Sequence, residues 1–133
     1  MVPNVRICKS SKVTLMRAQQ TMRFWEILGY EFGAVVVDRE PSCMNPRYGE
    51  IIITLPDGRF ANEHMAATRI YTDNKTGDII KASIFLLPVH ASKARVLEHE
   101  VGHALGWSHY RQKHHIMHPA WEYGGYERYG LKK

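Results

Sequence analysis

Apolar and β-branched side chains gather in short segments along the first two thirds of the chain. Five such segments are predicted strands: 5–8, 32–38, 50–56, 65–72 and 78–88. The fourth and fifth flank the turn-forming residues 73–77 and predict a hairpin. The second is expected to be buried, a Pro-rich loop should follow it over 41–49, and Asp57-Gly58 should close the third.

Two other segments have the apolar period of a helix. In residues 12–29, five apolar residues recur at spacings of three or four and predict one buried helix face: Leu15, Ala18, Met22, Trp25 and Leu28. Ser11 stands where an N-cap is expected, and Gly29 is a plausible helix end. A second helix is expected from Ser92 to Leu105. The order of elements predicts an α+β fold, with a mixed sheet and two helices before an irregular C-terminal segment.

Composition places these elements in a single globular domain. The chain has 133 residues, of which 44% are hydrophobic and 23% charged. No apolar run reaches the roughly 18 residues of a membrane span, and residues 1–15 lack the apolar stretch of a signal peptide. We therefore expect a chain that stays in the cytoplasm of the producing cell or is released after processing. The net charge of +5 comes from scattered residues and favours acidic partners only weakly.

The two cysteines leave two alternatives open. Cys8 and Cys43 can form one bridge, or they can be two unrelated thiols. A free Cys43 could in principle reach a metal as an inhibitory thiolate, although no pattern in the sequence supports that.

Seven of the 8 histidines follow residue 89, and three of them lie in HEVGHALGWSH, residues 99–109. His99 and His103 are one helical turn apart and point the same way, so two neutral imidazoles can share one zinc ion. Gly106 can take the positive φ that turns the chain and returns His109 as a third ligand. Three protein ligands leave one position open, which is typical of catalytic zinc.

Glu100 follows the first ligand and lies beside the open position. There it can take a proton from a zinc-bound water and pass it to a leaving amine. A lone His-x-x-x-His pair is often only a surface feature, but the extended pattern fixes five residue types in a helix followed by a turn. The sequence therefore predicts one catalytic zinc ion with a general base.

These residues resemble the zinc signature of metzincin metallopeptidases, which also have a downstream Met-turn. Met117, in HIMHP, lies eight residues after His109 and is followed by Pro119, a spacing similar to that of the matrixin branch. The resemblance implies that Met117 is an apolar floor beneath the metal. It also implies a zincin-like fold, a twisted mixed sheet with an antiparallel edge strand near Met65 to Tyr71 that pairs with the substrate.

The same resemblance implies two subdomains, with the zinc helix in residues 1–105 and the Met-turn in residues 106–133. Three residues after the Met-turn are candidates for the wall of the pocket beyond the scissile bond: Pro119, Trp121 and Tyr123. Tyr126 suits the same wall. The chain departs from the family at Tyr110, where matrixins usually have serine, and it has no recognisable calcium loop, so no structural calcium is expected.

Other candidates are weaker. His114, His115 and His118 are expected at the surface, since the three-histidine site is complete without them, and His64 and His90 have no partner pattern. The aromatic segment 119–130 could stack bases, but no basic groove accompanies it.

We therefore expect a monomeric zinc endopeptidase that prefers an apolar residue just after the scissile bond. Its partners should be protein or peptide substrates, without nucleic-acid or membrane partners. The alternative is a zinc-containing protein that binds peptides without cleaving them. An intact Glu100 argues against it, because a pure binder needs no base.

Overall fold

The computed structural model describes residues 1–56 and 65–133, so the turn expected at Asp57-Gly58 and the unassigned His64 lie outside the described residues. The described strands are β1 (Asn4–Cys8), β2 (Val35–Asp38), β3 (Glu50–Thr54), β4 (Ala66–Thr72) and β5 (Ile79–Leu86). The helices are α1 (Leu15–Glu26) and α2 (Val96–Ala104), with short 3₁₀ helices η1 (Lys9–Ser11), η2 (Pro88–His90) and η3 (Trp121–Tyr123). This order confirms the sequence of strands and long helices predicted above.

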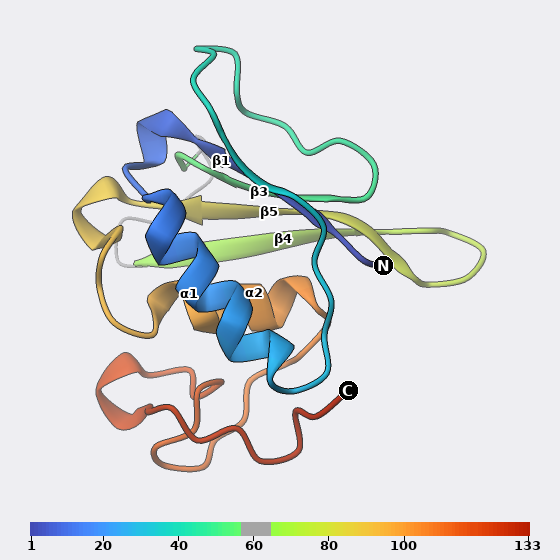
Figure 1. The fold of residues 1–133 in the computed structure, drawn as a ribbon. Coiled ribbons are helices and arrows are strands. Elements are labelled where there is room, and N and C mark those ends of the chain that lie inside the picture. Colours follow the sequence, from blue (N-terminus) through green and yellow to red (C-terminus); the bar gives the residue numbers. More distant parts are fainter. Residues whose placement is uncertain (57–64) are drawn as a thin grey trace.

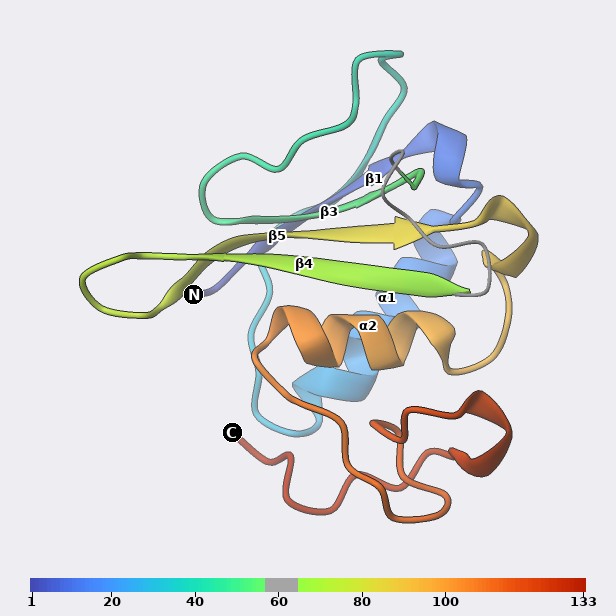
Figure 2. The same cartoon turned by 180° about the vertical axis from the view of Figure 1, so that it is seen from behind.

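The strands form one mixed sheet in the order β2-β1-β3-β5-β4. β1 pairs parallel with β2 and β3, and β3 pairs parallel with β5. β4 pairs antiparallel with β5 and forms an edge of the sheet, as expected for the hairpin. Both long helices lie on one side of the sheet, and the C-terminal segment runs beyond α2 (Figures 1 and 2). The structure therefore has the mixed α+β architecture that the sequence predicts.

The central strand β3 is buried on both faces because both faces are covered. Ile51 and Ile53 belong to the main core, which includes buried side chains of both helices, such as Trp25 and Val101. Ile52 points the other way and packs against Cys8 and Cys43. A strand covered on both sides has a continuous apolar sequence rather than an alternating one.

Three local expectations are wrong. Ser11 does not cap α1: its hydroxyl donates to the carbonyl of Cys8 within η1, and Thr14 is the N-cap, accepting from the backbone N–H of Arg17. α2 begins at Val96 rather than at residue 92, because Arg95 has a left-handed φ of 71° that a right-handed helix cannot include. β2 is partly exposed rather than buried, since it is the second edge of the sheet.

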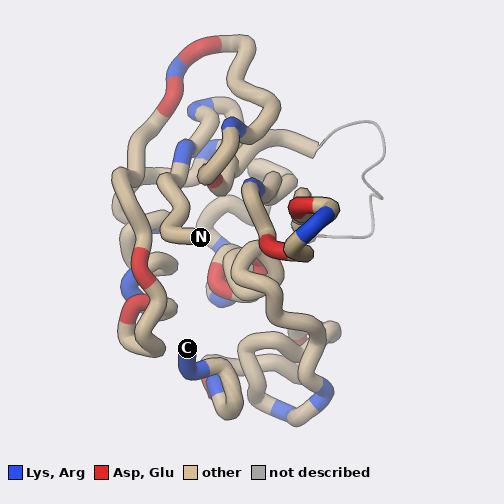
Figure 3. The backbone as a smooth tube through the Cα atoms, turned by 90° about the vertical axis from the view of Figure 1, so that its right-hand side faces the viewer, with Lys and Arg blue, Asp and Glu red and all other residues tan. Residues whose placement is uncertain are grey.

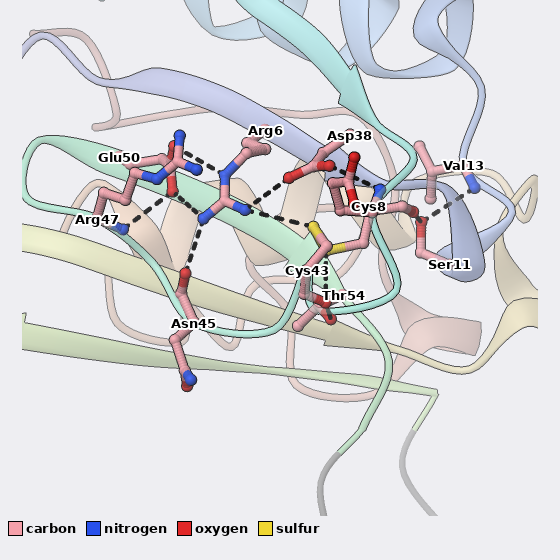
Figure 4. The surroundings of a disulfide bond; sticks show 11 residues. Arg6, Cys8, Ser11, Val13, Asp38, Cys43, Asn45, Arg47, Glu50 and Thr54 are labelled. Atoms are coloured by element: carbon pink, nitrogen blue, oxygen red, sulfur yellow. Dashed lines mark hydrogen bonds and ion pairs between the residues drawn. A yellow bond between two sulfur atoms is a disulfide. The ribbon is translucent and has the colours of Figure 1, made fainter.

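A disulfide and an arginine cluster hold the loop between β2 and β3 against the sheet (Figure 4). Cys8 and Cys43 are bonded, which decides between the two alternatives left open by the sequence and excludes Cys43 as a free thiolate. Beside them, the buried Arg6 donates to both carboxylate oxygens of Glu50 and to Asp38. A further bond from Arg6 to the carbonyl of Asn45 fixes the loop itself.

Removing the disulfide should destabilise the fold measurably. A Cys8→Ala/Cys43→Ala variant should lose about 3–4 kcal/mol of unfolding free energy, the loop-entropy estimate for a link across 35 residues. Urea unfolding of the variant and of the oxidised wild type gives the difference. Reduced wild type is the control and should unfold near the variant's midpoint. Equal midpoints for all three proteins would contradict a stabilising role.

Charged residues are spread along the described chain. Lys and Arg are interspersed with Asp and Glu in the backbone view of Figure 3, in agreement with the scattered pattern in the sequence. Of the helices described, none is long and apolar enough to cross a bilayer.

Candidate active site

The end of α2 and the turn after it bring three histidines together. His99 and His103 lie one turn apart on α2, and Gly106, with a φ of +106°, reverses the chain. The backbone N–H of Trp107 donates to the carbonyl of Gly102 and closes this turn. The Nε2 atom of His103 is then 3.1 Å from Nε2 of His99 and 3.2 Å from Nε2 of His109. The turn expected at Gly106 is present.

Backbone carbonyls fix the tautomers of the two helical histidines. Nδ1 of His99 lies 2.7 Å from the carbonyl oxygen of Ile116, and Nδ1 of His103 lies 2.8 Å from that of Trp107. A carbonyl only accepts, so each Nδ1 carries the proton and each Nε2 has a free lone pair. Such carbonyl partners are the usual outer-shell orientation of metal-binding histidines.

The converging Nε2 atoms fit a zinc ion. At Zn–N distances near 2.0–2.1 Å, tetrahedral geometry places two ligand nitrogens about 3.3 Å apart, close to the spacing here. The three histidines form a group that could hold a metal ion. Burial keeps them neutral, lowering the pKa of His99 to about 4 and the pKa values of His103 and His109 below their usual range.

Glu100 lies beside this group and is 7% exposed. Its carboxylate Oε1 accepts a 2.7 Å hydrogen bond from the hydroxyl of Thr68 on β4. Burial raises the pKa of Glu100 to about 7, and the bond from Thr68 acts in the opposite direction. A carboxyl group with a pKa near neutrality can both take up and release a proton.

A cleft of about 820 Å³ contains these groups. It is bounded by β4, α2 and the C-terminal segment, and its lining includes all three histidines and Glu100. Pro119 and Trp121, both candidates for the pocket wall, line it as well. Tyr123 and Tyr126 are not among its lining residues and are each 55% exposed.

The sequence model of the family described as Matrixin matches residues 38–133, which include the whole site. The chain belongs to the matrixin family. It is accordingly a zinc metallopeptidase domain, as the resemblance of the zinc motif implied. Strand β1 and helix α1 precede the matched region. No curated protein matches the chain.

In this matrixin, Met117 and Gly102 meet beneath the zinc helix. Met117 is fully buried. A Cβ built on Gly102 would collide with Sδ of Met117 and would lie 2.8 Å from Cζ2 of the buried Trp25. The zinc motif does not specify residue 102, whereas the packing requires a residue without a side chain there.

A Gly102→Ala variant should therefore be less stable, although alanine has the higher helix propensity. Overpacking a core costs about 1–3 kcal/mol. The change from glycine to alanine raises helix propensity by only roughly 1 kcal/mol, so the upper part of the overpacking range exceeds this gain. Thermal unfolding of the metal-free variant measures the balance. An unfolding temperature above that of the wild type would show that Met117 moves aside without cost.

Contacts with residues just before α2 hold Trp121 in place in this matrixin, and the sequence analysis predicted none of them. Its Nε1 donates to the carbonyl of Ala94, and the guanidinium of Arg95 lies 4.2 Å from its ring centroid. The ammonium of Lys93 lies 4.4 Å from the same centroid. Arg95 also donates to the carbonyl of Trp121 and lines the cleft. The wall thus combines an aromatic surface with positive charge.

The three extra histidines behave differently from one another. His114 is exposed, as expected, and His118 is partly buried and lines the cleft. His115, also expected at the surface, is fully buried: Nδ1 accepts from the backbone N–H of Met117, and Nε2 donates to the carbonyl of Tyr129. It crosslinks the C-terminal segment, which has no periodic pattern from which its burial could have been predicted.

A partly buried ion pair joins α2 of this matrixin to α1. Arg17 donates to both carboxylate oxygens of Glu98, at 2.6 and 2.7 Å. Trp25 donates from Nε1 to the backbone carbonyl of Glu98. Since Glu98 directly precedes His99, these bonds fix the position of His99 relative to the core.

Proposed function

We propose that this matrixin is an endopeptidase whose zinc ion is held by His99, His103 and His109, with Glu100 as the general base. One observation carries the proposal: three histidine Nε2 atoms converge beside a buried carboxylate in one cleft. Zinc bound there supplies a Lewis acid that polarises the scissile carbonyl and makes a water molecule more acidic.

The protein's own residues would then move the proton. Glu100 takes a proton from the water that attacks the carbonyl carbon, and afterwards gives it to the nitrogen of the departing amine. Its pKa of about 7 suits both steps at neutral pH. The histidines stay oriented throughout, because the carbonyls of Ile116 and Trp107 hold their Nδ1–H groups.

Edge strand β4 supports recognition of an extended peptide. Met65 and the first residues of β4 line the cleft beside the zinc helix, and β4 pairs only with β5 in the described sheet. A substrate strand can therefore add to its free edge through backbone hydrogen bonds, which depend little on side-chain identity.

The lining of the cleft supports a preference for an apolar residue directly after the scissile bond. Val96, Ile116 and Trp121 give the cleft an apolar surface, and the positive charge of Arg95 disfavours lysine and arginine beside it. Discrimination between apolar side chains should stay modest, since one methylene contributes only about 1–3 kcal/mol.

A Trp121→Ala variant should therefore lower the preference for leucine or phenylalanine over charged residues by about tenfold, with zinc binding unchanged. Cleavage sites in a peptide library, mapped by mass spectrometry, give the profile. Tyr129→Ala is the control, since Tyr129 is an exposed aromatic residue that does not line the cleft. An unchanged profile for Trp121→Ala would remove this residue from the specificity wall.

Digestion of casein and of a quenched peptide tests the function itself. Activity should disappear when a chelator removes the metal and return when zinc is added in slight excess. Zinc binding at one equivalent without any cleavage would instead support a peptide-binding protein that does not turn over.

A further inference from the structure

Thr68 connects the substrate-binding edge of the sheet to the proposed base. Its hydroxyl donates to Oε1 of Glu100 at 2.7 Å. Thr68 also lines the cleft, although no sequence motif includes it.

The position of this hydroxyl is determined by the sheet. Thr68 pairs with Ile84 in the β4–β5 register, and a β-branched side chain has few accessible χ1 rotamers on a strand. Glu100, in contrast, has three side-chain torsions and sits on a different element. A fixed donor therefore selects one orientation of a carboxylate that could otherwise rotate.

We propose that Thr68 is a positioning residue for Glu100: its hydroxyl holds one carboxylate oxygen so that the other faces the three histidines. The inference rests on the proposed role of Glu100 as the base. Because Thr68 belongs to the edge strand, the orientation of the base is coupled to the strand that receives the substrate.

The same hydroxyl also lies near the backbone of α2. The backbone carbonyl oxygen of Glu100 is 3.1 Å from Oγ1 of Thr68. The hydroxyl has a single hydrogen, and the shorter contact of 2.7 Å assigns it to Oε1 of the carboxylate. Oε1 remains an acceptor when the other carboxyl oxygen takes up a proton, so the bond from Thr68 can hold Glu100 in one orientation throughout the reaction.

Thr68→Val tests this role, because valine has nearly the same shape without the hydroxyl. We expect kcat to fall by about tenfold to hundredfold, the loss of one hydrogen bond to a charged group, while KM and zinc affinity change less than threefold. Thr68→Ser should restore most of kcat. Thr76→Val makes the same chemical change in an exposed turn away from the cleft and should leave kcat unchanged.

Two further measurements separate positioning from general damage. In a Glu100→Gln background, Thr68→Val should cause little further loss of the residual rate, because the group that it positions is gone. A crystal structure of metal-free Thr68→Val should show the Glu100 carboxylate displaced or in several conformers. Thr68→Ala serves if the valine variant does not fold.

Near-native kcat in Thr68→Val, failure of serine to restore the rate, or an undisplaced carboxylate would overturn the inference. These results also separate a failure of the role of Thr68 from a failure of the proposed function. If Glu100→Gln is inactive and Thr68→Val is fully active, only the role of Thr68 fails. If Glu100→Gln is itself fully active, the proposed base fails first.

Discussion

Replacing Glu100 by glutamine should lower kcat by about 10²–10⁴-fold while zinc remains bound, the typical contribution of a general base. Glutamine keeps the size of the side chain and can still accept from Thr68, but it cannot take a proton from water. The three histidines are unchanged, so zinc content should stay at one equivalent. Steady-state kinetics with a quenched peptide and metal analysis of the same sample measure both quantities.

Glu122→Gln is the matched control for this variant. Glu122 is exposed and does not line the cleft, so the same loss of charge there should leave kcat within twofold of the wild type. Near-native kinetics in Glu100→Gln would mean that another group accepts the proton. Loss of zinc from Glu100→Gln would instead show that the carboxylate helps to hold the metal.

Replacing His103 by alanine should abolish metal binding and activity together. Nε2 of His103 is 3.1 Å from Nε2 of His99 and 3.2 Å from Nε2 of His109. Alanine at this position therefore removes the central one of the three nitrogens proposed to hold the ion. Loss of an outer-shell partner alone typically lowers metal affinity 10–100-fold, so loss of a ligand should exceed about 100-fold. Competition with a chromophoric chelator measures the affinity.

His114→Asn is the control for the histidine variant. His114 is exposed and has a φ of 71°, a conformation that asparagine tolerates well. This variant should bind zinc as the wild type does. Zinc should also raise the unfolding temperature of the wild type and of His114→Asn, but not that of His103→Ala, because only native protein that binds the ion is stabilised by it. Tight zinc binding by His103→Ala would contradict the assigned ligand set.

The parts of the site predicted from the sequence are those determined by local geometry. The helical pitch places His99 and His103 together, and a glycine with positive φ is needed to return His109. The succession of strands and helices along the chain followed from apolar segments and turn residues in the same way. Each of these features depends on residues within about ten positions of one another, so spacing alone carries the information.

What the sequence did not reveal depends on contacts between distant segments. Thr68 meets Glu100 across 32 residues, and Arg17 meets Glu98 across 81. His114 and His115 are adjacent and chemically identical, yet one is exposed and the other fully buried, because the irregular C-terminal segment folds around His115. The one available signal for Thr68 was its place on the expected edge strand beside the zinc helix.

The link between Cys8 and Cys43 changes what self-digestion would look like. The 34 residues between the two cysteines include the whole connection from β1 to β2, with α1 in it, and β2 itself. If one enzyme molecule cuts another at a peptide bond in this span, the two pieces remain covalently joined and continue to pack on the same sheet. Such a nicked molecule would migrate as one band without reductant and as two bands with it. Nicked molecules would then lose activity during storage faster in a reducing sample than in an oxidised one, even when the same number of peptide bonds has been cut.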